Sequence, residues 1–581
     1  MMAEPFSIFG FSLPTFGILI GCLAVSFYFA YQKALPKPIP GIPYNKEATS
    51  SLLGEVIPMV KHVNKTKEIM DWMVEHNIKH NSPIVQVFTR PFARPWVLVA
   101  DYKEAQDVLL RRTKEFDRAN FFGDIFLGLL PKHHISMKSH DEEFKKHRRW
   151  LMDLMTPGFL NGIAAPHIYT ACDDMLDVWQ EKARLAQGHA FEAPSDVYHA
   201  ALDAVWSLVF GADISNSTTK SAFRSLSSMQ SLQLPTGINQ EVKIPEAPLP
   251  TSMAAIVSLV DTLAITITSP HPVFVHWLIR QLPSYRRNAK VRDDLIRDEV
   301  EKTRIRFEGK REKDVDVRCA MDDIMRRELS ACEKEGRAPM YHSRAMYDEI
   351  FGLVVAAHDT TSTTLTWALK FLADYPEVQD KLRTELFSGH ATAVSEKRKP
   401  TAAEIAKISI PYLDATQEEI VRCSLTEAGV VRTATADVEL LGKIIPKGTD
   451  VFFMGNGPSI FSPAFQIDDS LRSPTALSAK ERIGSWDPSD MAKFHPERWL
   501  VDGEKGGKEF SGAAGPLLTF GMGPRGCYGR RLAYVEMKIF LTLIVWTFEL
   551  QKCPAELSGY GSVDKLTHAP QQCYVRLKKV S

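Results

Sequence analysis

The chain has 581 residues, of which 45% are hydrophobic and 24% charged, enough to build a large globular core. Lysine plus arginine equals aspartate plus glutamate at 70 each, so the net charge of zero gives no reason to expect nucleic acid as a partner. The eight cysteines form no C-x-x-C pair, so neither a zinc ribbon nor a thioredoxin motif is indicated. Scattered cysteines in a chain of this size are typical of reduced thiols facing the cytosol.

The N-terminal segment predicts a membrane anchor. From Ser7 to Tyr31 no charge interrupts 25 residues, which is long enough for a helix to span a bilayer. Lys33 and Lys37 follow, so the downstream chain should be cytosolic. A cleaved signal peptide is the alternative, but the basic start and small-residue cleavage site that it needs are not evident. We expect an anchor over residues 1–32, a proline-rich extended hinge over 33–45, and one folded unit over 46–581.

The body has a mainly helical pattern with a few strand-like stretches. The segment Pro270–Ile279 is apolar and aromatic, which fits either burial or contact with a membrane surface. Further along, the sequence predicts two strands near the start, one long helix, a set of short strands and a polar surface loop, over Ile84–Phe88, Trp96–Val99, Tyr347–Ala373, Leu440–Phe453 and Ser462–Ser485.

The sharpest motif runs from Phe520 to Gly529 and has two interpretations. Its glycines match G-x-G-x-x-G, the dinucleotide fingerprint, and the acidic Glu549 follows at about the right distance. A dinucleotide domain needs further strand–helix units, however, and only 32 residues remain after Glu549. A ligand loop explains the segment better. Glycines let such a loop pass beneath a flat cofactor, Cys527 precedes a helix whose dipole favours a thiolate, and Arg525 offers a fork for a carboxylate.

The same segment fills every fixed position of F-x-x-G-x-R-x-C-x-G and so resembles the haem-binding signature of the cytochrome P450 superfamily. The resemblance implies that Cys527 is the axial thiolate ligand of the haem iron. It implies that Arg525 binds a haem propionate and that Phe520 packs near the thiolate. Arg148 fits the arginine of the family's W-x-x-x-R segment, with a phenylalanine in place of the tryptophan, and Arg432 is a further candidate propionate contact.

Three more segments follow the order that this family requires. Glu419 and Arg422 match its E-x-x-R pair, and Arg498, in a segment similar to F-x-P-E-R-[FW], is expected to join them in a buried network. The run from Ala356 to Thr361 resembles the oxygen-activation motif A-G-x-D-T-T, with Ala357 in place of glycine. By this resemblance Asp359 and Thr360 guide protons and solvent toward bound oxygen.

The resemblance implies a mainly α-helical fold with small β-sheets, a single cytochrome P450 domain following one transmembrane helix. It implies haem b as cofactor, O2 as cosubstrate and NADPH as electron source through NADPH–cytochrome P450 reductase. The expected reaction is oxygenation of a lipophilic small molecule in secondary metabolite biosynthesis, in a single-pass protein of the endoplasmic reticulum membrane with a cytosolic catalytic domain. The loop Ser462–Ser485 resembles an insertion of fungal members. Substrate specificity should lie in Phe121–Leu130, Leu232–Leu263 and Thr449–Ile460.

Two other functions remain open on the same fold. A haem-thiolate isomerase or dehydratase would need neither oxygen nor a reductase, and the Asp359–Thr360 pair argues against it. A haem protein that only senses or stores a ligand is the second alternative, and the anchor together with the oxygen motif argues against it.

Overall fold

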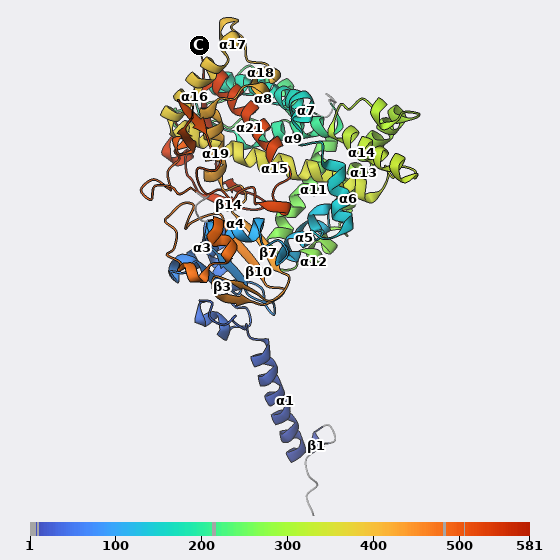
Figure 1. Cartoon of the computed structure of the whole chain (residues 1–581), viewed down its shortest axis with the longest axis vertical. Helices are drawn as coiled ribbons and strands as arrows, with labels where there is room; N and C mark the ends of the chain where they lie inside the picture. Colours follow the sequence, from blue (N-terminus) through green and yellow to red (C-terminus); the bar gives the residue numbers. More distant parts are fainter. Residues whose placement is uncertain (1–6, 9–10, 212–216, 480–483, 505, 581) are drawn as a thin grey trace, which may run out of the picture.

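One long helix, α15 (Arg344–Asp374), crosses the middle of the molecule (Figure 1). The computed structural model describes residues 7–8, 11–211, 217–479, 484–504 and 506–580, with side chains from Ile18 onward. Ser343 caps α15 by accepting the backbone N–H of Met346, and the helix stops before Pro376, which cannot continue it. The helix predicted over Tyr347–Ala373 is confirmed, and it continues without a break through Ala357.

Helices pack around α15 to form the main hydrophobic core. The principal helical packing partners of α15 are α9 (Pro194–Phe210), α19 (Pro411–Ser424) and α21 (Arg530–Thr547), and α8 (Ala165–Ala186) packs against α9 and α21. All four bury apolar side chains along most of their lengths. Other helices of eight or more residues are α2 (Val56–Thr66), α3 (Ile69–Lys79), α4 (Tyr102–Leu110), α5 (Asn120–Leu127), α6 (Glu142–Leu151), α10 (Thr218–Ser227), α11 (Thr251–Ile267), α12 (Pro272–Ile279), α13 (Pro283–Phe307), α14 (Ala320–Glu335) and α16 (Pro376–Gly389).

The largest sheet joins segments far apart in the sequence. Its five strands lie in the order β3 (Ile84–Val87), β4 (Trp96–Val99), β10 (Asp450–Met454), β7 (Gly429–Ala434) and β5 (Phe116–Arg118). The two early strands and the short strands predicted near residue 450 are thus confirmed. In the antiparallel pairing of β5 with β7, Arg118 lies directly opposite Arg432. Figure 1 shows this sheet between the helical body and α1 (Leu13–Ala34).

The segment expected to be a polar surface loop is more ordered than predicted. It contains a short helix, α20 (Pro474–Ala479), that contacts α4, while residues 480–483 lie outside the described part of the chain. Arg472 donates to Asp101 and Glu104 at 3.0 and 2.8 Å, and its side chain is 6% exposed. This segment is therefore fastened to the body by a buried charge cluster, which its polar composition alone did not indicate.

The N-terminal helix and α12 both expose apolar side chains. Figure 1 shows α1 projecting away from the body, and large hydrophobic residues between Ile18 and Phe29 are exposed. Phe274 and Trp277 of α12 are each 57% exposed, whereas His276 is buried. Among the residues that the structure describes, no helix combines the length and the apolar character needed to cross a membrane.

Candidate functional site

A glycine-rich loop presents Cys527 just before α21. A single 3-10 turn (Gly523–Arg525) and a hydrogen bond of 2.7 Å from the Cys527 N–H to the Phe520 carbonyl fold this loop back on itself. Gly523 has a φ of +68°, and a Cβ there would collide with the carbonyl oxygen of Leu109. Only glycine suits that position, so the loop can pass close to the end of α4. The ring of Phe520, at the start of the loop, packs against that of Tyr534 with the centroids 5.4 Å apart.

The Cys527 thiol is accessible although protein surrounds it. Burial raises its pKa, while the Gly529 amide and the nearby Arg530 and Arg148 lower it less. The expected influence of the helix start is thus present but smaller than the cost of burying a charge. A cation beside the sulfur would reverse this balance, since a thiol that coordinates a metal ion is deprotonated outright.

Several arginines with few protein partners gather beside the cysteine loop. Burial and then mutual repulsion lower the pKa of Arg118 and Arg525 to about 9 and that of Arg432 to about 10. The guanidinium of Arg148 lies 4.2 Å above the Tyr528 ring, and burial lowers its pKa as well. Like charges placed opposite each other on paired strands are destabilising, so this arrangement favours a bound polyanion.

Arg525 shows most directly what the site would bind. Its Nη2 donates to the carbonyls of His134 and Ile135 at 3.4 and 3.2 Å, but its buried Nε and Nη1 have no partner among the described residues. The ring of Phe144 lies 4.2 Å below its guanidinium, so the phenylalanine that replaces the family's tryptophan holds this arginine in place. The two propionates of haem would supply the missing acceptors, and Cys527 would supply the iron ligand. The residues present therefore fit haem.

The predicted oxygen motif lies on α15. Thr360 donates its hydroxyl to the Ala356 carbonyl at 2.8 Å, and Asp359 accepts a hydrogen bond of 3.2 Å from Thr567. The adjacent His358 is buried; its Nδ1 lies 2.6 Å from the Val354 carbonyl and must carry a proton. Its Nε2, 2.9 Å from the Tyr198 hydroxyl, therefore accepts. Asp359 thus has a hydroxyl partner on the C-terminal hairpin that sequence reasoning did not identify.

The predicted E-x-x-R network is confirmed. Glu419 is fully buried and accepts from Nε and Nη2 of Arg422 at 2.8 and 2.7 Å. Arg498 donates to the same carboxylate at 3.1 Å, and the Trp499 indole N–H does so at 2.8 Å. Arg422 in turn donates to the Met491 and Lys493 carbonyls, so the network ties α19 to the segment that leads toward the cysteine loop.

Comparison with known proteins agrees with this geometry. The family model described as cytochrome P450 matches residues 53–458 and 488–558. The chain belongs to the cytochrome P450 family. The unmatched residues 459–487 coincide with the insertion around α20. As a member, the chain is expected to use haem, O2 and reducing equivalents.

The curated relatives extend over nearly the whole chain. Cytochrome P450 monooxygenase TRI13 of Fusarium sporotrichioides is 38% identical, covering 96% of this chain and 98% of that protein. Cytochrome P450 monooxygenase xilC of Penicillium rubens is 36% identical, covering 97% and 96%. The crystal structure of the cytochrome P450DA haem domain aligns with a TM-score of 0.66 over 94% of this chain and 99% of that one, at 16% identity, which shows the fold. The chain is accordingly an oxygenase of the P450 monooxygenase class.

The structure places Cys527, Arg525, Arg148 and Arg432 near one another and adds Arg118, while their roles at a haem stay predictions. Nothing in the local sequence marks Arg118, because it follows a phenylalanine and an aspartate at the end of a short strand. Its position depends on the pairing of β5 with β7, about three hundred residues away. Only the register between β5 and β7 identifies Arg118 as a neighbour of Arg432, and that register cannot be read from a single sequence.

Proposed function

We propose that the protein inserts one atom of O2 into a lipophilic small molecule of secondary metabolism, using NADPH-derived electrons delivered by a cytochrome P450 reductase. The observation that carries the proposal is the exposed Cys527 beside Arg118 and Arg525, because the buried Nε of both arginines and the buried Nη1 of Arg525 have no acceptor among the described residues. Haem bound there would supply the oxygen chemistry; Cys527 would hold its iron, and Arg525, Arg148, Arg432 and Arg118 would bind its propionates.

On the α15 side, the chain's own residues would manage protons. Asp359 and Thr360 are adjacent, and the Thr360 hydroxyl is tied to the Ala356 carbonyl, a pattern that bends helices. An acid and a hydroxyl at such a point can order water and deliver protons in a directed way. Positioned proton transfer contributes on the order of 10²–10⁴-fold in rate.

Apolar surface supports a lipophilic substrate. The helix α5, which overlaps the predicted specificity segment Phe121–Leu130, contacts α11 and α12, and Phe121 and Phe122 are only partly buried. Ala356 on α15 is accessible, so small apolar surface faces the same part of the molecule as the oxygen motif. Burial of a substrate against such side chains would supply about 25 cal/mol per Å² of apolar area.

We further propose that the chain is anchored in the endoplasmic reticulum membrane through residues 1–32, with the body in the cytosol. The exposed apolar side chains of α1 and its projection from the body support this (Figure 1). The exposed Phe274 and Trp277 of α12 would form a second contact with the lipid surface. On the cysteine side, the exposed Arg530 and Arg531 would attract an acidic reductase.

The test is reconstitution of the purified chain with reductase and NADPH. We expect the red-shifted absorption band of the reduced carbon monoxide complex, loss of that band in Cys527→Ala, and consumption of NADPH and oxygen on addition of substrate. Thr360→Ala should keep haem and substrate binding but divert reducing equivalents into peroxide. Conversion of a substrate without oxygen would instead establish the isomerase alternative, and ligand binding without any turnover would establish a sensor.

A further inference from the structure

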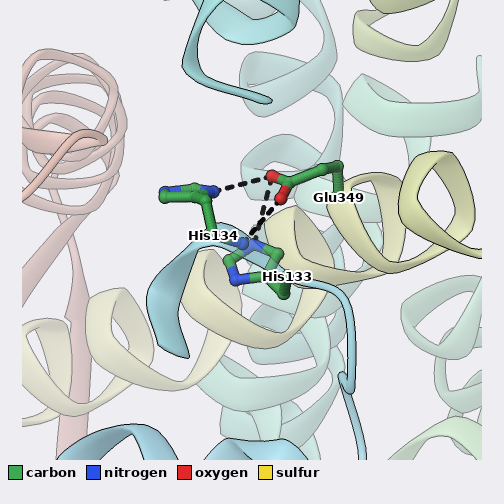
Figure 2. A group of neighbouring side chains, drawn as sticks. All are labelled: His133, His134 and Glu349. Carbon is green, nitrogen blue, oxygen red and sulfur yellow. Dashed lines mark hydrogen bonds and ion pairs between the residues drawn. The ribbon is translucent and has the colours of Figure 1, made fainter. Parts of the chain in front are cut away.

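Three histidines converge on one buried carboxylate at the N-terminal part of α15, and Figure 2 shows two of them, His133 and His134, beside Glu349. Glu349 is fully buried, and its Oε2 lies 2.7 Å from Nδ1 of His134 and 3.5 Å from Nε2 of His133. Its Oε1 accepts the backbone N–H of His134 at 2.7 Å and lies 2.8 Å from Nδ1 of His147. His133 and His134 belong to the segment that precedes α6, and His147 lies on α6.

Two histidines and a carboxylate at this spacing are also a possible metal-ligand set, since their ligand atoms lie within 4.8 Å of one another. The protonation of His133 decides against it. Its Nδ1 accepts the backbone N–H of Ile135 at 3.2 Å, so the ring proton is on Nε2, which lies 3.5 Å from Glu349. A metal ligand needs a lone pair at that nitrogen. His134 and His147 each place Nδ1 within 2.8 Å of a carboxylate oxygen, which requires a proton on those nitrogens too.

The cluster is therefore a set of donors around one anion. The surrounding histidines lower the pKa of Glu349 well below its usual range despite complete burial, so the carboxylate stays charged. Burial lowers the pKa of His133 to about 3, so that imidazole is neutral. A buried charge is tolerated when several N–H groups point at it. Gly352 shows how closely the cluster is packed, because a Cβ there would overlap the His133 ring.

The histidine donors lie in the same segments that position Arg525 and Arg148 at the proposed haem site. Arg525 donates to the carbonyls of His134 and Ile135, the same short segment whose amide and imidazole bind Glu349. His147 immediately precedes Arg148 on α6 and stacks on Trp150 with ring centroids 4.9 Å apart. One carboxylate on α15 thus connects the two segments that carry or orient Arg525 and Arg148.

We propose that Glu349, clamped by His133, His134 and His147, is a positioning residue that fixes Arg525 for the haem propionates and so sets how tightly haem is held. The inference rests on the proposed role of Arg525 at the haem. Glu349 itself would not touch the cofactor; it would act through the His134–Ile135 carbonyls.

The test measures the rate at which ferric haem leaves the protein for an excess of haem-free globin. Glu349→Gln keeps the size but gives the donors an amide with one acceptor oxygen, and we expect haem loss on the order of ten-fold faster, as for one lost charge-assisted hydrogen bond. Arg525→Lys, which loses the fork, should accelerate haem loss as well. Because Glu349 acts through Arg525, the two substitutions should not be independent. The double variant should lose haem more slowly than the product of the two single fold-changes in rate would give.

Asp196→Asn is the matched control. Asp196 is also a buried carboxylate, bonded to Lys182 at 2.7 Å and to Trp179 at 3.1 Å, and no contact joins it to the arginine cluster within the described residues. In the double variant Asp196→Asn/Arg525→Lys, the fold-change in the rate of haem loss should equal the product of the two single fold-changes, because the two sites are independent. If Glu349→Gln does not fold, His147→Leu removes one donor, and His147→Asn, which retains an N–H near the Nδ1 position, should restore slow haem loss.

Each result has one consequence. If Arg525→Lys leaves the rate unchanged, the proposed haem contact of Arg525 is wrong and this inference falls with it. If Arg525→Lys accelerates haem loss but Glu349→Gln does not, only the positioning role of Glu349 is refuted. The same holds if the fold-changes of these two variants multiply in the double variant, as they do for the control. A stoichiometric non-haem metal that is bound by the purified holoprotein and lost in Glu349→Gln would overturn the hydrogen-bond assignment in favour of a metal site.

Discussion

Removing the carboxylate of Glu419 should destabilise the haem-side core more than any surface change of the same charge. Five N–H groups from Arg422, Arg498, Trp499 and the His495 backbone converge on this side chain, which is fully buried. In Glu419→Ala, two guanidinium groups and an indole N–H lose their acceptor in a site without water access. Breaking a buried ion pair from one side costs about 3–5 kcal/mol, which is a factor on the order of 10²–10⁴ in the folding equilibrium.

Urea unfolding of the holoprotein, followed by Soret absorbance and by circular dichroism, measures this free energy. The haem content of freshly purified protein should fall in parallel. Glu497→Ala is the control, because this nearby glutamate pairs with Lys381 at 2.8 Å with side chains 37% and 45% exposed. An exposed pair contributes about 0–1 kcal/mol. The reasoning is refuted if Glu419→Ala unfolds within about 1 kcal/mol of this control and keeps full haem content.

Three further results are expected. Gly523→Ala should lower haem content and cost at least about 1–2 kcal/mol, because its φ of +68° disfavours a side chain, whereas Gly158→Ala, with open space around it, should change neither quantity. Arg118→Met should raise the melting temperature of the haem-free protein by relieving repulsion, yet accelerate haem loss from the holoprotein. A variant that stabilises both the haem-free protein and the bound haem, or weakens both, would contradict the assignment of an anion site. Burial raises the pKa of Glu104 from 4.5 to about 7, so stability should fall as pH rises through that window, by at most about 3 kcal/mol; Glu104→Gln should flatten this slope in urea titrations from pH 4.5 to 8.

Local spacing predicted the parts of the site that lie within one turn or one helix. The cysteine loop, the Glu419–Arg422 pair and the long helix of the oxygen motif each depend on residues a few positions apart, where backbone geometry fixes what can meet. The docking of the insertion through Arg472 and the facing of Arg118 with Arg432 depend on segments hundreds of residues apart. Sequence chemistry shows that such charges need partners but not which distant strand or helix supplies them.

The unmet charges at the site have a common consequence for folding. The arginine cluster is held together against its own repulsion, and the Cys527 thiol is less acidic than a free one, so both are unfavourable in the protein without cofactor. A ligand that carries two carboxylates and a metal cation reverses both effects at once. Anything that binds the folded but not the unfolded chain stabilises the fold by mass action. The haem-free fold should therefore be selectively weakened around β5, β7 and the cysteine loop, and hydrogen exchange of their amides should slow on haem binding more than that of α8 and α9, whose buried apolar contacts need no cofactor.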